Sequence, residues 1–129
     1  MSRVEYRVAG QAEPISHFTD AVRAGDLLFV SGIVPVDANR ELVGGDDVVA
    51  QARQVFANMG EVLAAAGCSL ADVVKVTIFL TDVDDRSLVN PVRQEVFGET
   101  RPASTLVEVP ALVIPGAKIE VEAVALVPS

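Results

Sequence analysis

The chain is poor in residue types that proteins use for cross-links and metal sites. Its 129 residues include one cysteine, Cys68, and one histidine, His17. A single cysteine cannot form an internal disulfide, and a single histidine cannot build a usual zinc site. The sequence also lacks a basic and apolar signal pattern at its start. These absences predict a cytoplasmic protein without a metal centre.

Positive charge and long apolar runs are equally scarce. Lysine and arginine number 10 against 18 aspartates and glutamates, so the formal net charge is −8 at pH 7. Non-specific nucleic-acid binding depends on basic side chains that replace counterions, and we therefore expect no nucleic-acid partner. Half of the residues are hydrophobic, yet no apolar run approaches the roughly 20 residues that span a bilayer. We expect no membrane insertion.

The residues that are present fit one folded domain over residues 1–129. A chain of this length buries roughly two thirds of its unfolded surface and needs no disulfide. Pro115-Gly116 suits a type II turn, because proline sets φ at the first central position and glycine accepts positive φ at the second. The turn predicts a hairpin whose arms are residues 103–112 and 117–127.

Other strands and one long helix follow from the spacing of apolar residues. Alternating or continuous apolar runs predict strands at residues 4–8, 19–24, 27–32 and 73–81. Apolar residues at helical spacing predict a helix between residues 49 and 66. Asp46 or Asp47 would cap the start of this helix, and Gly67 would stop it.

A second, shorter helix is predicted from its proline. Proline is tolerated in the first turn of a helix and breaks its interior. Asn90 as N-cap and Pro91 at the first helical position predict a helix that ends near Phe97, with residues 86–89 as a preceding turn. Asp82, Asp84 and Asp85, just before that turn, are expected to cap a helical segment.

These elements predict an α+β fold with a single mixed β-sheet. Right-handed parallel connections through each helix would place both helices on one face of the sheet. In residues 119–127 one face is apolar throughout, and the other becomes apolar at Val124 and Leu126. Because a strand that is apolar on both faces needs cover on both sides, we expect the open sheet face to pack against other copies of the chain.

Several stretches resemble the RidA/YjgF family, also known as the L-PSP or Rid family. They read LLFVSGIVPVD at 27–37, AQARQVFANMGEVLAAAGCSLADVVKVTIFLTDVDD at 50–85, RPASTLVEVPAL at 101–112 and KIEVEAVAL at 118–126. The resemblance implies a chorismate-mutase-like homotrimer with small-molecule clefts between its subunits. It also implies hydrolysis of reactive enamines or imines to keto acids and ammonia, with no metal or cofactor.

The chain departs from the family's deaminase motif, which reads P-A-R-S. Here Pro102-Ala103 is followed by Ser104 and Thr105, so the arginine that would pair with a substrate carboxylate is missing. Arg101 could replace it only if the backbone bends at Pro102, because an odd separation puts two side chains on opposite faces of a strand. We expect weak activity on classical 2-imino acids.

The other cleft residues implied by the resemblance each have a plainer interpretation. Glu120 matches a carboxylate that orients or activates the attacking water, but it could be an ordinary sheet-face acid. Ser31 and Gly32 match a strand-end pair that lines the cleft, but they also suit a strand terminus. Asn90 matches a cleft asparagine, but its N-cap role suffices. Phe18 stands where the deaminases commonly carry tyrosine, which removes a hydroxyl from the site.

Two function classes stay open. The first is a cofactor-free enamine or imine deaminase with an altered substrate, in which Glu120 handles water. The second is a non-catalytic family member that binds a small metabolite or a protein partner in the same clefts. A ribonuclease or translation inhibitor ranks third, because an acidic chain with one histidine gives it little support. The sequence does not identify the substrate or the pathway.

Overall fold

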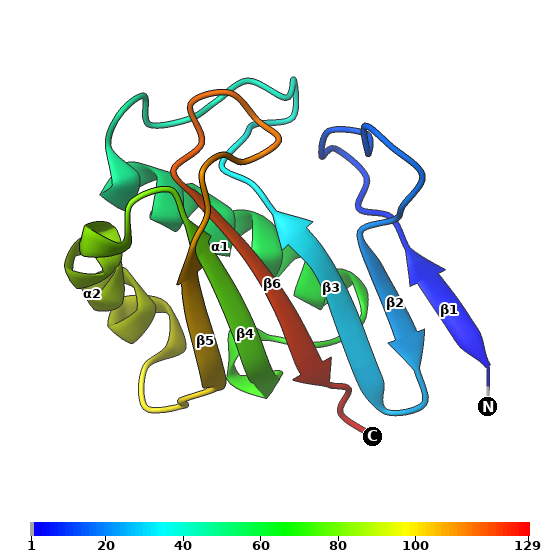
Figure 1. The fold of residues 1–129 in the computed structure, drawn as a ribbon. Helices are drawn as coiled ribbons and strands as arrows, with labels where there is room; N and C mark the ends of the chain where they lie inside the picture. The colour runs from blue at the N-terminus through cyan, green and yellow to red at the C-terminus, as the bar shows by residue number, and fades with distance from the viewer. Residues whose placement is uncertain (1) are drawn as a thin grey trace.

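Six strands form one mixed sheet in the computed structural model, which describes residues 2–129. The strands are β1 (Arg3–Tyr6), β2 (Ala21–Ala24), β3 (Leu27–Ile33), β4 (Val73–Leu80), β5 (Ala103–Glu108) and β6 (Ile119–Leu126). Their order across the sheet is β1-β2-β3-β6-β4-β5 (Figure 1). β4 and β5 pair in parallel, whereas the other neighbours pair antiparallel.

Helix α1 (Val48–Ala65) forms where its apolar spacing predicts. The side chain of Asp47 caps its start by accepting hydrogen bonds from the backbone N–H groups of Val49 and Ala50. Gly67, whose φ of 77° suits glycine, follows its end. One stripe of α1 is buried in the core against the sheet, namely Val48, Ala52, Val55, Phe56, Met59, Val62 and Leu63.

Helix α2 (Arg86–Phe97) begins before the predicted start, so the N-cap predicted for Asn90 is wrong. Asn90 lies inside the helix, and Pro91 is an interior residue. An interior proline removes one backbone hydrogen bond and costs roughly 3 kcal/mol. The helix continues through it because Val89 and Val92, which flank the proline, are both buried.

Both helices cover the same face of the sheet, as predicted; in Figure 1 α1 lies behind the strands and α2 lies at the β5 side. They meet where the rings of Phe56 and Phe97 pack edge to face, with centroids 5.5 Å apart. Two 3-10 turns, η1 (Leu70–Asp72) and η2 (Val83–Asp85), flank β4. Of the aspartates predicted to cap a helical segment, Asp82 caps η2 with its side chain, whereas Asp85, at the N-cap of α2, makes no side-chain cap hydrogen bond. Within residues 2–129 no helix has the length and apolar character needed to cross a membrane.

The predicted hairpin of residues 103–112 and 117–127 is wrong, because β4 lies between β5 and β6. The turn itself forms: Gly116 has a φ of 84°, and the N–H of Ala117 closes the turn with a 3.0 Å hydrogen bond. It belongs to a loop, residues 109–118, that is long enough to cross two strand spacings of about 4.8 Å each. β6 also separates β3 from β4, so the parallel pairing predicted across α1 does not form either.

The sheet face opposite the helices is open and largely apolar. Phe29 pairs across strands with Val124, and Leu27 pairs with Leu126. Phe29 and Leu126 are 45% and 51% exposed. The apolar residues of this open face are Leu27, Phe29, Phe79, Val107, Val124 and Leu126. The uncovered β surface expected from the sequence is therefore present in the single chain.

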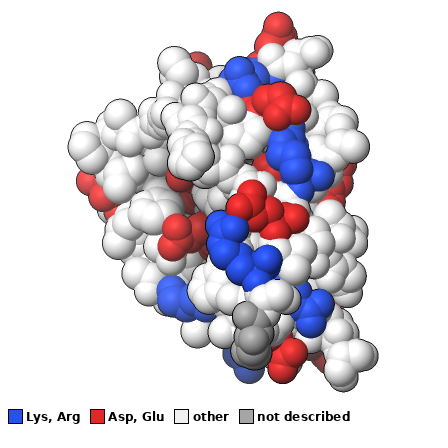
Figure 2. Space-filling view, turned by 90° about the vertical axis from the view of Figure 1, so that its right-hand side faces the viewer, with Lys and Arg blue, Asp and Glu red and all other residues white. Residues whose placement is uncertain are grey.

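The β1 edge of the sheet carries charges of both signs side by side (Figure 2). Arg3 pairs with Glu5 within β1. Just after the strand, Arg7 pairs with Asp20 at 2.7 Å and with Glu13 at 3.3 Å. Charged side chains on an edge strand disfavour pairing with a further strand, so this edge is protected against association.

Candidate functional site

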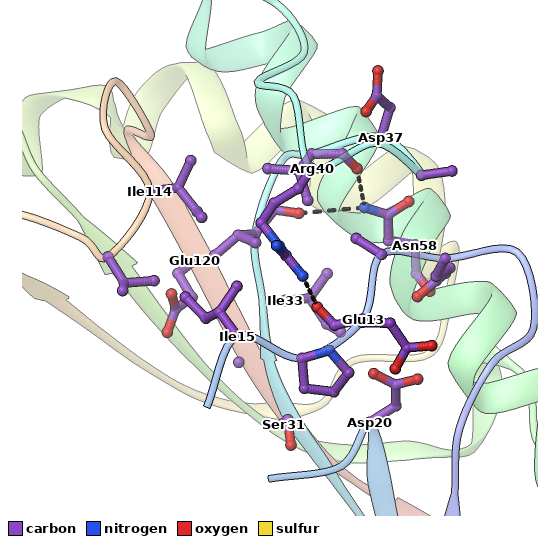
Figure 3. A pocket seen from close by; sticks show the side chains of 18 of the residues that line it. Glu13, Ile15, Asp20, Ser31, Ile33, Asp37, Arg40, Asn58, Ile114 and Glu120 are labelled. Atoms are coloured by element: carbon purple, nitrogen blue, oxygen red, sulfur yellow. Dashed lines mark hydrogen bonds between the residues drawn. The ribbon is translucent and has the colours of Figure 1, made fainter. Parts of the chain in front are cut away.

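A cavity of about 570 Å³ opens beside β3 and β6. Its walls come from the loop between β1 and β2, from β3 and the residues that follow it, from α1, and from β6 with the loop before it (Figure 3). Phe18, Ser31, Gly32 and Glu120, four of the residues that the sequence marks as cleft candidates, all line this cavity. The fold thus joins positions that lie far apart in the sequence.

Glu120 is the half-buried carboxylate of the cavity. Its neighbours in β6, Ile119 and Val121, are fully buried beneath the helices, so strand alternation turns Glu120 to the opposite face. Burial raises the pKa of Glu120 above its ordinary value of 4.5, and the negative charge of Glu122 raises the pKa further. Such a group can exchange protons nearer to neutral pH than an exposed carboxylate.

Gly32 gives the Glu120 carboxylate its space. A Cβ atom built on Gly32 would lie 2.5 Å from Oε2 of Glu120 and 3.0 Å from its carboxyl carbon. The pairing of β3 with β6 also shifts register between Val30 and Ile33, which forms an irregularity at Ser31 and Gly32. Such irregularities re-aim side chains and are frequent beside functional sites. Gly32 therefore has a steric role in this site, because it leaves room for the carboxylate of Glu120.

Ser31 and Asp20 fasten the N-terminal wall of the cavity. The hydroxyl of Ser31 donates to the carbonyl of Thr19 at 2.6 Å, and its N–H donates to the carbonyl of Asp20 at 3.0 Å. The carboxylate of Asp20 accepts from Arg7 at 2.7 Å and from the N–H of Val8 at 2.8 Å. Phe18, next to this anchored segment, is 51% exposed and presents its ring on the cavity wall.

Four other candidates lie outside this cavity in the single chain. Ser104 and Thr105 are on β5, which β4 separates from β6, and Arg101 is an exposed residue before β5 begins. Asn90 is exposed on α2. Thr105 accepts a 3.1 Å hydrogen bond from the ammonium of Lys75. One chain therefore does not bring the altered motif into contact with Glu120.

The sequence reasoning missed the wall formed by residues 33–40. Arg40 lies in this wall, and its φ of 62° makes it the only non-glycine residue with positive φ in the described part of the chain. Asn58 of α1 holds the segment by donating to the carbonyls of Val34 and Val36 at 3.3 and 2.9 Å. Asn58 could have been found from the sequence, because it is a polar residue next to the apolar stripe of α1. Nothing in the local sequence marked Arg40.

Metal ligation is not supported by the side chains of the described residues. Between residues 2 and 129, no three histidine, cysteine, aspartate or glutamate side chains gather as a metal site requires. The cavity offers the chemistry of several carboxylates, of which Glu120 is half-buried, together with serine and carboxamide side chains and one arginine.

Fold and cavity together define a small α+β protein with a carboxylate set in an open pocket beside its sheet. The family model described as Endoribonuclease L-PSP matches residues 9–127. That match and the relatives below show that the chain belongs to the RidA/YjgF family.

Proteins of known name resemble the chain over nearly its whole length. A RutC family protein of Pyrococcus horikoshii is 42% identical over 88% of this chain and 89% of its own length. The 3-aminoacrylate deaminase RutC of Acinetobacter baylyi is 41% identical over 90% and 91%. The human 2-iminobutanoate/2-iminopropanoate deaminase is 37% identical over 98% and 93%. A solved structure of a Rid family protein from Yersinia pestis superposes with a TM-score of 0.91, at 33% identity, covering 98% of this chain and 100% of that one.

Proposed function

We propose that the protein is a hydrolytic deaminase that converts a small enamine or imine to a carbonyl compound and ammonia. The observation that carries this proposal is Glu120, a half-buried carboxylate with a raised pKa in a cavity large enough for a small metabolite. Two relatives named as deaminases, of 3-aminoacrylate and of 2-iminobutanoate or 2-iminopropanoate, support the same reaction class.

The reaction needs only water and proton transfer. An enamine first takes a proton on carbon and gives up one from nitrogen, which makes it an imine. Water then adds its oxygen to the C=N carbon, and the π electrons of that bond move to nitrogen, which takes a proton. The resulting carbinolamine loses its hydroxyl proton as the C=O group forms and the C–N bond breaks with its electron pair on nitrogen. The nitrogen takes a proton and leaves as ammonia. Ionised Glu120 would accept the proton from the attacking water and return it to the departing nitrogen.

The substrate should differ from that of arginine-bearing deaminases. Ser104 stands where the family's motif has arginine, and serine cannot form the bidentate pair that a guanidinium makes with a carboxylate. Loss of one partner of a buried charge pair costs on the order of 2–5 kcal/mol. We therefore expect turnover of classical 2-imino acids to be well below that of enzymes with the full motif.

We further propose that the working unit is a homotrimer. The open face of the sheet supports this assembly, since a contiguous apolar surface on a small protein marks association. The family resemblance implies that β5 of one copy, with Ser104 and Thr105, would then lie at the cavity mouth of its neighbour. The clefts would then lie between subunits, and each would combine residues that one chain keeps apart.

Nucleic acid is a poor fit to the charge of the molecule. The net charge is −8, and over the β1 edge basic side chains, among them Arg3 and Arg7, stand beside acidic ones (Figure 2). The family model's description as an endoribonuclease therefore has less support here than deamination. We also propose a cytoplasmic location, which suits the free, buried Cys68.

The test is an assay in which 2-aminoacrylate is generated in place and the keto acid is measured against its spontaneous formation. Native protein should accelerate the release, and Glu120→Ala should abolish the acceleration. Ser104→Arg should raise it, because the variant restores the motif's cation. Turnover that is brisk and insensitive to Glu120 would contradict the assignment. Absence of turnover, together with binding of a small acid, would favour the non-catalytic alternative.

A further inference from the structure

The charges that face the cavity differ in whether they already have partners. The carboxylate of Asp20 is bonded to Arg7 and to the N–H of Val8. Glu61 accepts from the amide of Gln11 at 2.8 Å. These acids are therefore committed to holding the walls and are poor candidates for ligand contacts.

Two further acids of the cavity also have partners. Asp37 accepts from the backbone N–H groups of Asn39 and Glu41 at 2.9 and 3.0 Å, which closes the turn that carries Arg40. Glu13 pairs with Arg7 at 3.3 Å. Among the acids of the cavity within the described residues, Glu120 is the one without a hydrogen-bond or ion-pair partner.

Arg40 is the corresponding cation. Its guanidinium donates to the backbone carbonyl of Glu13, and no carboxylate of the described chain pairs with it. A guanidinium has five N–H donors, and Arg40 is exposed, so most of its donors can meet solvent or a ligand. Figure 3 shows the side chain of Arg40 extending into the cavity, with Glu120 on one side of it and Glu13 at its tip.

The position of Arg40 is set by backbone geometry. Its φ of 62° lies in the left-handed region, which residues other than glycine, asparagine and aspartate seldom adopt. The carboxylate of Asp37 closes the turn that carries Arg40. Asn58 holds the segment that leads into this turn by donating to the carbonyls of Val34 and Val36. The turn thus directs the side chain of Arg40 into the cavity, although glycine at this position would adopt the same φ with less strain.

We propose that Arg40 binds the carboxylate of the substrate and so determines specificity for acidic enamines or imines. It would take over only the binding part of the role of the cation missing at Ser104, so that 2-imino acids are still bound while their turnover stays below that of enzymes with the full motif. This inference rests on the proposed deaminase function and names the ligand class of the same cavity. A short acid whose carboxylate is held by Arg40 would leave its C=N carbon on the side of Glu120. The free guanidinium donors match a carboxylate in bidentate geometry.

Arg101 is the competing candidate for the same role. Both arginines are exposed, but Arg101 lies outside the cavity of its own chain, whereas Arg40 lines the cavity of a single chain. Neither arginine has a described carboxylate partner. The pair Arg40→Gln and Arg101→Gln therefore forms a matched comparison in which each variant removes one charge.

The experiment measures binding of 2-oxobutanoate, the keto acid left by hydrolysis of 2-iminobutanoate, and of the neutral ketone 2-butanone. Dissociation constants are read from NMR shifts of native protein, Arg40→Gln, Arg40→Lys and Arg101→Gln at low and high salt. We expect Arg40→Gln to weaken 2-oxobutanoate binding at least about tenfold and to leave 2-butanone unchanged. Arg40→Lys should keep part of the affinity, and Arg101→Gln should bind like native protein.

Several outcomes would overturn the inference. It fails if native protein does not bind 2-oxobutanoate, if Arg40→Gln binds it as native does, or if Arg101→Gln alone shows the loss. It also fails if both ligands weaken equally in Arg40→Gln, since that would indicate a damaged cavity. Arg40-dependent binding without any turnover defeats only the deaminase proposal, whereas Glu120-dependent turnover with an unchanged KM in Arg40→Gln defeats only the role of Arg40.

Discussion

The carboxylate of Glu120 occupies the space above Gly32 that the side chain of any other residue would need. A Cβ atom at position 32 would approach Oε2 of Glu120 to 2.5 Å. The clash is with the end of a flexible side chain and not with backbone. A larger residue at position 32 should therefore displace the carboxylate while the fold persists.

Gly32→Ala tests this relationship directly. We expect kcat/KM to fall about tenfold or more, because a displaced carboxylate no longer meets the attacking water. The melting temperature should change little. Gly60→Ala is the matched control: a Cβ there meets no atom within 4 Å, and alanine favours a helix interior over glycine. Equal activity in Gly32→Ala and native protein would contradict a positioning role for Gly32.

Glu120→Gln should change how stability depends on pH. Because the folded pKa is raised, the folded chain holds this proton more tightly than the unfolded chain does. This contribution to stability is fully present below the ordinary value of 4.5 and is lost as pH rises through the folded pKa. The variant should therefore gain stability relative to native protein as pH rises above 4.5. Melting temperatures measured across this range check it, and a difference that does not vary with pH would count against the shift.

Glu122→Gln should move the pH profile of the reaction. Glu122 contributes to the raised pKa of Glu120 through its negative charge. If ionised Glu120 accepts the water proton, kcat/KM declines as pH falls through that pKa. Removal of the charge at position 122 lowers the pKa, so the acid limb should shift to lower pH. A profile that does not move would show that Glu122 does not act on the reacting group.

Gln51→Leu should destabilise the fold. Gln51 is completely buried, and its amide donates to the carbonyls of Gly45 and Gly116 at 2.6 and 3.1 Å. Its oxygen accepts from the N–H of Lys118 at 2.7 Å. Leucine leaves these backbone groups unpaired, at about 1–3 kcal/mol for each one that stays buried. Urea unfolding measures the loss, with the exposed Gln94→Leu as control, and equal effects of the two variants would contradict the assigned role.

Phe29→Glu should prevent assembly. Phe29 lies at the middle of the open face beside Val124, so a charge there cannot be buried against another copy without a large desolvation cost. Light scattering should give native protein three times the 13.6 kDa of one chain and the variant a smaller mass. Val4→Glu, on the β1 edge and outside the open face, should leave the mass unchanged. A native protein with the mass of a single chain would contradict the trimer.

Local sequence patterns predicted the helices and strands well but predicted poorly which strands lie side by side in the sheet. The spacing of apolar residues located α1, and Pro115-Gly116 located a turn that does form. The turn signal reverses the chain but does not say which strand the returning segment meets, so the insertion of β4 between β5 and β6 was missed. The proline rule failed at Pro91 because burial of Val89 and Val92 outweighs one lost hydrogen bond.

The sequence by itself determined the strands, the long helix and the apolar second face of β6, because the spacing of apolar residues along the chain predicts each of them. It also determined the family, because the family's motifs are local stretches of sequence. Only the tertiary structure decided that Gly32 makes room for Glu120 and that Arg40 enters the same cavity. These contacts join residues far apart in the chain through the strand order and a left-handed turn, and no local pattern encodes them.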